Sequence, residues 1–560
     1  PLAIELIAPR IRMMSPESLL AWLDDQVFLS ADGMRAVPSR QKTLENAIEW
    51  SYSLLSAEER DLFTGLSVFP GGFTLHAAET IYSQTATGHS ISDLVASLSN
   101  KSIIQRAPEG SDESRYKMLF TIQQFAQERL RHREGEAQAR NWHLAYFLDL
   151  ARQADKEIHG PAQVEWIRRL ELEDDNFRAA LDWGMSSRQI ELSLRLLNAI
   201  LEVWIGRHHL SKIQSRFDTL RGLPEIHSYP ELYARLLNHM GRIRWLSGDF
   251  SAARAILKEG QEIWSELGVK GAKGLAECLR IQGLVACFME GEDPDIARAL
   301  LEESLNLHEI QGNLWGKAFT YLLFGMLAGR QNKYTEVFPM LEKSMDLFRQ
   351  LGDIWGIARV SQRLGQYYLE QENHEKARLH FEQHLTLDEE LSFKQGIIVA
   401  LGNLGELYRY QGVYDQAQIF YERSLWMCRT YDVGDCGYNL YALGMLALHK
   451  EDYHLAKKFF HDYYISSRGI TELKAISMFL IGCAAIAAAT NEPARAARLS
   501  GAAMSLSHTI NRPIPPFDQA EFDRHIHNAR RQLGEVAFQA LQSEGQAMTP
   551  TQAIDYAVVS

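Results

Sequence analysis

A glycine that returns at nearly constant spacing through the second half of the chain constrains the fold more than any other feature. Self-similarity of this length is typical of repeat proteins, in which each unit packs only on its neighbours. A chain of 560 residues is also too long for one hydrophobic core, so an extended array is expected. The positions lie 38 to 42 residues apart: Gly241, Gly283, Gly325, Gly365, Gly405, Gly444 and Gly482.

Three further positions recur at fixed distances after most of these glycines. The glycine lets two helices approach closely, an aromatic residue or histidine closes the turn between them, and a small residue and a large apolar residue fill the contact. The second unit reaches its alanine late, at Ala297, through an insertion near residues 293–294. The aromatic or histidine positions are Phe250, Tyr334, His374, Tyr414 and Tyr453; the small positions are Ala253, Val337, Ala377, Ala417, Ala456 and Ala494; the large positions are Leu257, Leu341, Phe381, Tyr421 and Phe460.

These offsets resemble the tetratricopeptide pattern, and the long period resembles the variant found in bacterial regulators of the maltose-activator type. The sequence therefore predicts a mainly all-α chain whose largest part is an α-solenoid of tetratricopeptide-like helix pairs. We assign the solenoid to residues 230–512, a helical connector to 134–229 and a C-terminal helical cap to 513–560.

The segment 43–133 has a different pattern, in which helices end in a short hairpin. Ser56 and Glu59 form a capping box at the start of one helix, and Thr74 can cap the next one after a sharp turn at 69–73. Helices followed by a two-stranded hairpin and a closing helix describe a winged-helix domain. The expected helices are 43–55, 57–68, one beginning after Thr74, 91–98 and 121–131, and the expected strands are 102–106 and 115–119.

Composition excludes several classes of protein. The net charge of −13 argues against general binding to nucleic acid or to an anionic membrane surface. The longest apolar run, at 478–489, is too short to span a bilayer, so we expect no membrane association. The five cysteines form no CxxC pair and no even framework, which fits a reducing compartment and a cytoplasmic protein.

Several stretches resemble one bacterial family, the LuxR/AfsR-like signal-transduction ATPases of the STAND (NB-ARC) type. Residues 50–55 and 66–73 resemble the winged-helix module of that family, and 494–501 with 514–516 resemble its C-terminal tail. The opening residues 1–6 resemble the end of its nucleotide-binding module, where a Gly-Leu-Pro-Leu-Ala motif lies near ADP. The resemblance makes 1–35 the helical end of that module and Pro1 a remnant of its nucleotide site.

Two departures from the family pattern affect the expected chemistry. No G-x-x-x-x-G-K-[ST] motif is present, so the phosphate-binding half of the ATPase is missing. Where related ATPases carry a Met-His-Asp motif, this chain has Met118-Leu119-Phe120, and leucine cannot donate a hydrogen bond to a phosphate. We expect a fragment or degenerate relative that has no cofactor of its own, and ATP or ADP only together with the missing module.

No pattern of catalytic residues is present, so we expect no enzyme activity. Neither H-E-x-x-H nor G-x-S-x-G occurs, and the close histidine pairs have no third ligand nearby, so no metal is expected. The carboxylates of 171–175 read as a solvated helix face. The stretch 38–135 holds 10 Lys and Arg against 12 Asp and Glu, so direct DNA binding by the winged helix is not expected.

Two functions remain. In the first, the chain is the regulatory and sensor arm of a STAND-type transcriptional regulator, whose repeats bind a protein or a small anionic inducer and signal to the missing ATPase module. In the second, it is a stand-alone tetratricopeptide scaffold for protein assembly. Residue types alone do not separate the two.

The candidate binding residues follow from the repeat register, because the first helix of each tetratricopeptide pair lines a concave groove. Positions that are three or four residues apart share one helix face, and arginine recurs there beside aromatic residues. We infer an anionic partner, such as an acidic peptide, a carboxylate or a phosphorylated ligand. The alternative is that these arginines are solvated or pair with glutamates of neighbouring repeats. The candidates are Arg235, Asn238, Arg242, Trp245, Arg280, Arg330, Arg359, Gln362, Gln366, Glu406, Arg409, Tyr410, Tyr441 and His449.

Overall fold

The computed structural model divides the chain into two units, each with its own core. Unit 1 comprises Pro1–Lys156 and Glu165–Ile200, and unit 2 comprises Glu157–Val164 and Leu201–Ser560. The helical end predicted at 1–35, with Pro1, lies outside the residues that the structure describes. The described residues are 39–82, 89–107, 114–132, 135–205, 210–289, 292–431, 436–466, 472–510, 514 and 516–558.

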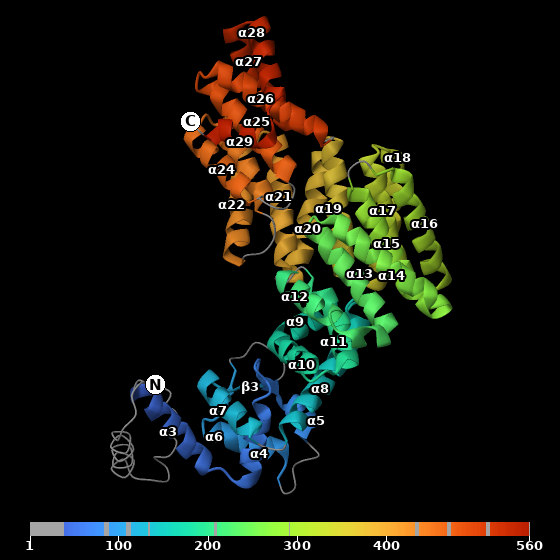
Figure 1. The fold of residues 1–560 in the computed structure, drawn as a ribbon, viewed down its shortest axis with the longest axis vertical. Coiled ribbons are helices and arrows are strands. Elements are labelled where there is room, and N and C mark those ends of the chain that lie inside the picture. The colour runs from blue at the N-terminus through green and yellow to red at the C-terminus, as the bar shows by residue number, and fades with distance from the viewer. Residues whose placement is uncertain are drawn as a thin grey trace. The chain divides into compact units, whose positions relative to one another are not determined.

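Unit 1 begins with the predicted winged-helix domain (Figure 1). The hairpin strands pair antiparallel, but the sheet has a third strand that the sequence did not predict, in the order β1-β3-β2. This strand has only two residues and pairs Phe73 with Tyr116, a length too short to show alternation in the sequence. The elements are α3 (Ser39–Ser53), α4 (Ala57–Leu66), β1 (Phe73–Thr74), α5 (Leu75–Tyr82), α6 (Ile91–Asn100), β2 (Gln105–Arg106), β3 (Arg115–Lys117) and α7 (Phe120–Arg131).

Local capping signals placed these helices correctly. The Ser56 side chain accepts from the backbone N–H of Glu59, and the Glu59 carboxylate accepts from the backbone N–H of Ser56, so the capping box is confirmed. The hydroxyl of Thr74 accepts from the backbone N–H of Ala77 at 3.1 Å at the start of α5. Both caps satisfy amide groups that would otherwise lack partners.

A series of helices follows the winged helix and leads into the repeats. They bury apolar stripes that include Leu144, Phe147 and Phe177 of unit 1. The last helices before the repeats belong to unit 2. The helices are α8 (Glu136–Glu157), α9 (Gln163–Leu172), α10 (Asp174–Ser186), α11 (Ile190–Trp204) and α12 (Leu210–Arg221), with a short 3-10 helix η2 (Pro224–Ser228).

Unit 2 consists mainly of consecutive helix pairs, as the glycine period predicted (Figure 1). Within a pair the two helices pack on one another, and the first helix also packs on the first helix of the next pair. The pairs are α13 (Pro230–Leu246) with α14 (Phe250–Glu266), α15 (Ala272–Phe288) with α16 (Pro294–Ile310), α17 (Leu314–Arg330) with α18 (Tyr334–Leu351), α19 (Ile354–Glu370) with α20 (His374–Glu390), α21 (Lys394–Tyr410) with α22 (Tyr414–Tyr431), α23 (Gly437–His449) with α24 (Tyr453–Ser466), and α25 (Glu472–Ala489) with α26 (Pro493–Thr509); the 3-10 helix η3 (Gly268–Gly271) precedes α15.

Five of the seven repeat glycines face the large residue that the register predicted. A Cβ atom added at Gly405 would lie 2.8 Å from the ring of Tyr421, closer than real side chains approach. The small residues twelve positions after the glycines are fully buried in five of the six predicted cases, and the aromatic or histidine residues begin the second helices. The same close contact joins Gly241 to Leu257, Gly325 to Leu341, Gly365 to Phe381 and Gly444 to Phe460.

Two repeats depart from this register. In the second pair, Gly283 faces Leu301, because the insertion shifts the helix by two residues. In the last pair, Gly482 faces Phe460 of the preceding pair, and Ala496 is buried instead of the predicted Ala494, which is half-buried. The last pair therefore packs on its neighbours in a different way.

The C-terminal helices α27 (Pro516–Leu533), α28 (Glu535–Gln546) and α29 (Pro550–Val558) pack on the last pair. Helix α28 lies along α26, and a Cβ atom added at Gly501 would lie 2.0 Å from the carbonyl oxygen of Gln542. The capping box that the sequence indicated is present, because the backbone N–H of Thr549 donates to Gln552 and the reverse bond also forms.

The cysteines differ from the expectation. Cys428 and Cys436, whose Cα atoms are 6.0 Å apart, form a disulfide between the last turn of α22 and the start of α23. Their spacing of eight residues matches no cysteine motif, so this pair could not be predicted from the sequence. Cys278, Cys287 and Cys483 are free.

Across the residues that the structure describes, no helix combines the length and the apolar character needed to cross a bilayer.

We predict that Gly405→Ala lowers the free energy of unfolding by about 1–3 kcal/mol through overpacking. The Tyr421 ring cannot move aside, since it is fully buried and its hydroxyl donates to Glu406 at 2.6 Å. Gly260→Ala is the matched control, because the added Cβ would lie 3.4 Å from Leu237, an ordinary contact. Urea unfolding should show the control unchanged or stabilised by up to about 1 kcal/mol. Equal midpoints for the two variants would show that the glycine contact is not tight.

Candidate functional site

The arginines that the register placed on the first helices find carboxylates in their own chain. Arg242 of α13 pairs with Glu202 of α11 at 2.6 Å. Burial acts to raise the pKa of Glu202, but the positive charge of Arg242 holds it well below the ordinary value. Arg280 of α15 is 2% exposed and its Nε donates to Glu277 at 2.9 Å, one turn earlier on the same helix.

Aromatic rings complete the surroundings of Arg280. Its guanidinium carbon lies 5.4 Å from the ring centre of Trp315 and 4.8 Å from that of Phe319, both on α17. A guanidinium stacks well on aromatic faces because it is planar and only weakly hydrated. Arg280 therefore joins two repeats and is not available to a ligand.

Arg359 of α19 is held by a buried acidic group. It pairs with the carboxylate of Asp388 on α20, which is fully buried, and Nε2 of His384 lies 2.9 Å from the same carboxylate. Burial lowers the pKa of His384, so its ring is neutral and adds no charge to this group. Arg359 and Asp388 thus form a neutral pair.

The most buried cluster surrounds Arg409 of α21. Arg409 is 3% exposed and pairs with Glu406 at 2.7 Å and with Asp518 of α27 at 2.5 Å. Burial alone would lower the pKa of Arg409, but the two carboxylates raise it well above the ordinary value. Tyr421 adds a hydrogen bond to Glu406 at 2.6 Å.

Helix α27 supplies the acidic partner at this end of the array. Asp518 meets Arg409, and three residues later Glu521 accepts from Nδ1 of His449 on α23 at 3.2 Å. The sequence predicted an acidic peptide on these very residues, and the chain's own C-terminal helix occupies them. The predicted binding face is therefore covered by α27 at α21 and α23.

The candidate residues differ in how far they reach solvent. The expectation that they line an open groove is wrong for Asn238, Arg280, Arg409 and Tyr441, which are 2% or 3% exposed. Asn238 serves packing, because it donates to the carbonyl oxygen of Gly274 at 3.0 Å. The remaining candidates, Arg235, Arg242, Trp245, Arg330, Arg359, Gln362, Gln366, Glu406, Tyr410 and His449, are half-buried or exposed.

One charged residue on the same helices was missed by the register. Arg363 of α19 is half-buried, and its Nη1 donates to Oε1 of Gln366 at 3.0 Å. Burial lowers its pKa, and the neighbouring Arg359 acts in the same direction. Arg363 stands two residues before Gly365, outside the offsets used to choose candidates, and only its position one turn after Arg359 could have indicated it.

A short segment of unit 2, Glu157–Val164, closes the N-terminal end of α19. Gln163 donates to Oδ1 of Asp353 at 3.0 Å and accepts from the backbone N–H of Trp355 at 2.9 Å. Asp353 is fully buried, also accepts from Trp315 at 2.9 Å, and caps α19. This end of the helix is saturated with internal hydrogen bonds.

In unit 1 an ion pair fixes the sharp turn before β1. Arg115 of β3 donates to the carbonyl oxygens of Gly71 and Gly72 at 3.0 and 3.2 Å and forms a forked pair with Glu173. Asn176 of α10 donates to Gly72 and accepts from Gly71. Glu173 is 7% exposed, so the prediction that the carboxylates of 171–175 form a solvated face is wrong at this position.

The helix at the DNA-recognition position of the winged-helix domain lacks positively charged residues. In helix-turn-helix domains the second helix of the motif enters the major groove, and here that helix is α6. It contains no Lys or Arg, and its exposed residues include Asp93, Ala96 and Asn100. Lys101, which follows it, pairs with Glu59. Contacts to phosphates depend on cations, so α6 is poorly suited to them.

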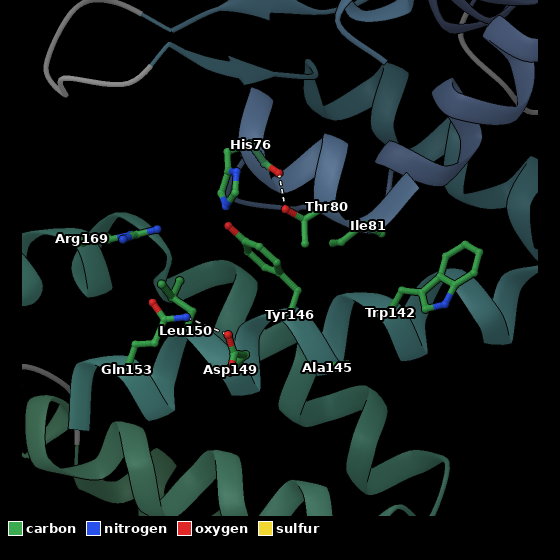
Figure 2. A pocket seen from close by; sticks show the side chains of 10 residues that line it. All are labelled: His76, Thr80, Ile81, Trp142, Ala145, Tyr146, Asp149, Leu150, Gln153 and Arg169. Atoms are coloured by element: carbon green, nitrogen blue, oxygen red, sulfur yellow. Dashed lines mark hydrogen bonds between the residues drawn. The ribbon is translucent and has the colours of Figure 1, made fainter. Parts of the chain in front are cut away.

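A hollow of about 370 Å³ opens between α5 and α8 in unit 1. Figure 2 shows His76 of α5 and Tyr146 of α8 pointing toward one another, with Arg169 of α9 directed to the same space. Gln153 donates to Asp149 at 2.7 Å on the rim. Most of the polar side chains here are exposed, and the hollow lacks the desolvated polar group that marks many ligand sites.

Metal and nucleotide features are sparse among the described residues. Within them, no group of three or more His, Cys, Asp or Glu side chains is arranged to hold a metal ion. Leu119 precedes α7 as its N-cap without a side-chain hydrogen bond, Met118 is buried, and Phe120 is 71% exposed. The three residues that precede and open α7 are thus apolar.

We predict that Arg409→Ala destabilises unit 2 by about 3–5 kcal/mol, because Glu406 and Asp518 would remain buried without a counter-charge. An arginine that lined an open groove, as the sequence predicted, would tolerate this change, and the burial of Arg409 reverses that expectation. Arg378→Ala is the control, since Arg378 is an exposed arginine 3.8 Å from Glu382 and should change stability by about 0.5 kcal/mol or less. Equal unfolding midpoints for both variants would contradict the buried cluster.

Acid should destabilise unit 2 through His308. Burial holds the pKa of His308 at about 4, below the 6.5 of a free histidine, so the unfolded chain takes up a proton first as the pH falls. Its contribution to stability is complete above pH 6.5 and is lost progressively toward pH 4, by roughly 2 kcal/mol at pH 5. His308→Gln should flatten the dependence of urea unfolding on pH, and the exposed-site control His461→Gln should not. An unchanged slope in His308→Gln would refute this assignment.

Comparison with known proteins agrees with this architecture. The tetratricopeptide repeat family matches residues 317–390 and 356–430, which fall on α17 to α22. The winged helix-turn-helix domain family matches residues 55–131, which fall on α4 to α7. Both parts of the predicted fold are therefore present.

Two mycobacterial proteins are similar in sequence. Rv0890c of Mycobacterium tuberculosis (strain ATCC 25618 / H37Rv), named as an HTH-type transcriptional regulator, is 35% identical over 221 residues, which are 39% of this chain and 25% of that protein. Rv0894 of the same strain, an uncharacterized protein, is 34% identical over 141 residues, 25% of this chain and 35% of that protein. The chain thus spans only part of the length of these relatives.

Two solved structures superpose on the chain with low scores. A Signal Transduction ATPase with Numerous Domains that has a tetratricopeptide repeat sensor, from Pyrococcus horikoshii, gives a TM-score of 0.46 at 15% identity, over 97% of this chain and 74% of that one. A Rap protein complexed with Competence and Sporulation Factor gives 0.43 at 15% identity, over 70% and 99%. The chain combines a winged helix-turn-helix domain with tetratricopeptide repeats, and in part it is similar to an HTH-type transcriptional regulator.

Proposed function

We propose that the chain is the sensor and interaction arm of a larger bacterial transcriptional regulator. Its repeats bind a protein or a small anionic inducer, and the winged-helix domain passes that state to an ATPase module. The observation that carries the proposal is the order of the parts, a winged helix-turn-helix domain followed by tetratricopeptide repeats. The 35% identity to a protein named as a transcriptional regulator supports it.

The proposal assigns recognition, not catalysis, to this chain. Several buried ionisable groups of the repeats form neutral pairs, such as Arg359 with Asp388, which suits a structural role more than a catalytic one. The apolar Leu119 supports a chain that holds no nucleotide by itself and depends on the ATPase module for ATP or ADP. A regulator of this kind works in the cytoplasm.

In this proposal the winged-helix domain packs against its neighbouring helices and passes the state of the repeats to the ATPase module. It does not bind DNA. Helix α6 has no cation, and the wing residue Arg115 is fully used by Glu173 and by the glycine turn. These contacts tie β3 to α10, so a displacement of α10 would move the whole winged helix. Such an ion pair suits mechanical coupling better than phosphate contact.

Transcript profiling of the host after deletion of the gene tests the regulatory role. A regulator predicts that a confined set of transcripts changes by about fivefold or more, the lower end of typical regulatory coupling, and that the intact gene restores them. A stand-alone scaffold, the other candidate, predicts no such set and the loss of a co-purifying assembly instead. An unchanged transcript profile would reject the regulatory proposal.

A further inference from the structure

Arg363 differs from the buried and half-buried arginines of the repeats that pair with carboxylates. It lies on α19 with Nη1 3.0 Å from Oε1 of Gln366, and among the described residues it forms no ion pair. The carboxylate of Glu370 acts on it only through space, and the hydrogen bond of Arg363 to a side chain goes to a neutral amide. A guanidinium that is partly removed from water in this way is poorly compensated, because burying charge without a paired counter-charge is unfavourable.

Four other arginines on the first helices show which partner a buried arginine normally has in this chain. Each of them meets at least one carboxylate of this chain, and burial of the charge is thereby offset. By the same logic the natural counter-ion of Arg363 is a carboxylate in direct contact, and none of the described residues supplies one within ion-pair distance. The four arginines form five such pairs: Arg242 with Glu202, Arg280 with Glu277, Arg359 with Asp388, and Arg409 with both Glu406 and Asp518.

The nearby carboxylates of this chain are already engaged. Asp388 binds both Arg359 and His384. Glu370, two turns after Arg363 on α19, accepts from the hydroxyl of Tyr334 at 3.0 Å. Arg359 and Asp388 cancel one another, so a single positive charge remains at Arg363, which matches one carboxylate better than a doubly charged phosphate.

An unused donor lies next to this charge, on α21. Gln366 connects the two helices, since its Nε2 lies 3.5 Å from Oδ1 of Asn403, a weak contact. The Asn403 Nδ2 atom is buried and has no hydrogen-bond partner. A carboxylate has two oxygens that can accept bonds, one from a guanidinium and one from an amide.

We propose that Arg363, Gln366 and Asn403 bind one carboxylate group of the molecule that the repeats sense. This inference rests on the proposed sensor role and specifies its chemistry. The carboxylate belongs either to an acidic peptide or to a small organic acid, since both carry the same group. The remaining face of α21 and α23 is closed to it by α27.

Calorimetric titration of the full chain with two probes tests the site and separates the two sources. The probes are tetraglutamate and succinate. Saturable binding of either one supports the site and identifies the source as peptide or small acid. Binding of neither probe, or tighter binding of inorganic phosphate than of both, would overturn the carboxylate assignment.

Substitutions at Arg363 and Asn403 test whether the probe binds at these residues. Arg363→Gln and, separately, Asn403→Ala should weaken the bound probe by about tenfold or more, as expected for a charged hydrogen bond. Arg378→Gln removes the same charge from the exposed face of α20 and should bind normally, which controls for general electrostatics. Equal weakening by Arg378→Gln would overturn the assignment.

Stability distinguishes a binding role from a structural one. Because Arg363 lacks a paired counter-charge in the free chain, Arg363→Gln should leave the melting temperature unchanged or raise it. Succinate or tetraglutamate should raise the melting temperature of the unmodified chain and should not change that of the variant. A large loss of stability in Arg363→Gln would mark a structural residue and reject the site. If the titrations succeed but the deletion leaves transcripts unchanged, the carboxylate site stands and the regulatory role fails.

Discussion

The contact between a repeat glycine and the large residue sixteen positions later is the interaction on which the rest of the chain depends. At Gly241, Gly325, Gly365, Gly405 and Gly444 no side chain fits, so each first helix approaches its partner closely. One pair cannot bury its apolar face alone, and stacking of pairs completes the core. The same stacking sets the positions of the charged residues on the first helices, because their register follows from the glycine.

The positive charges on the first helices of the repeats are largely neutralised by carboxylates of the same chain. Four of the six arginines that look like a ligand-binding row in the sequence are paired with carboxylates. The pairs of Arg242 with Glu202 and of Arg409 with Asp518 tie elements that lie apart in the chain. A buried ion pair is costly to break but need not stabilise more than an apolar contact would. Such pairs therefore fix the arrangement of helices, and Arg363, which has no such pair, becomes the informative exception.

Local signals in the sequence predicted much of this structure. The capping boxes at Ser56 and Thr549 and the repeat register follow from short-range patterns, and the structure confirms them. The pairing of Arg409 with Asp518 could not be predicted, because 109 residues separate them and no local rule brings α27 to α21. Burial of Glu173 was missed for the same reason, since its partner Arg115 lies on a strand 58 residues earlier.

The central claim is that the repeats form a recognition surface in which Arg363 on α19 carries a charge without an ion-pair partner among the described residues. Amide hydrogen exchange of the full chain, measured with and without tetraglutamate or succinate, tests this claim most directly. The account predicts slower amide exchange confined to α19 and α21, around Arg363 and Asn403, because a bound carboxylate would tie these two helices together. Exchange that is unchanged with both probes, or protection that appears only on the outer helices α20 and α22, would contradict it.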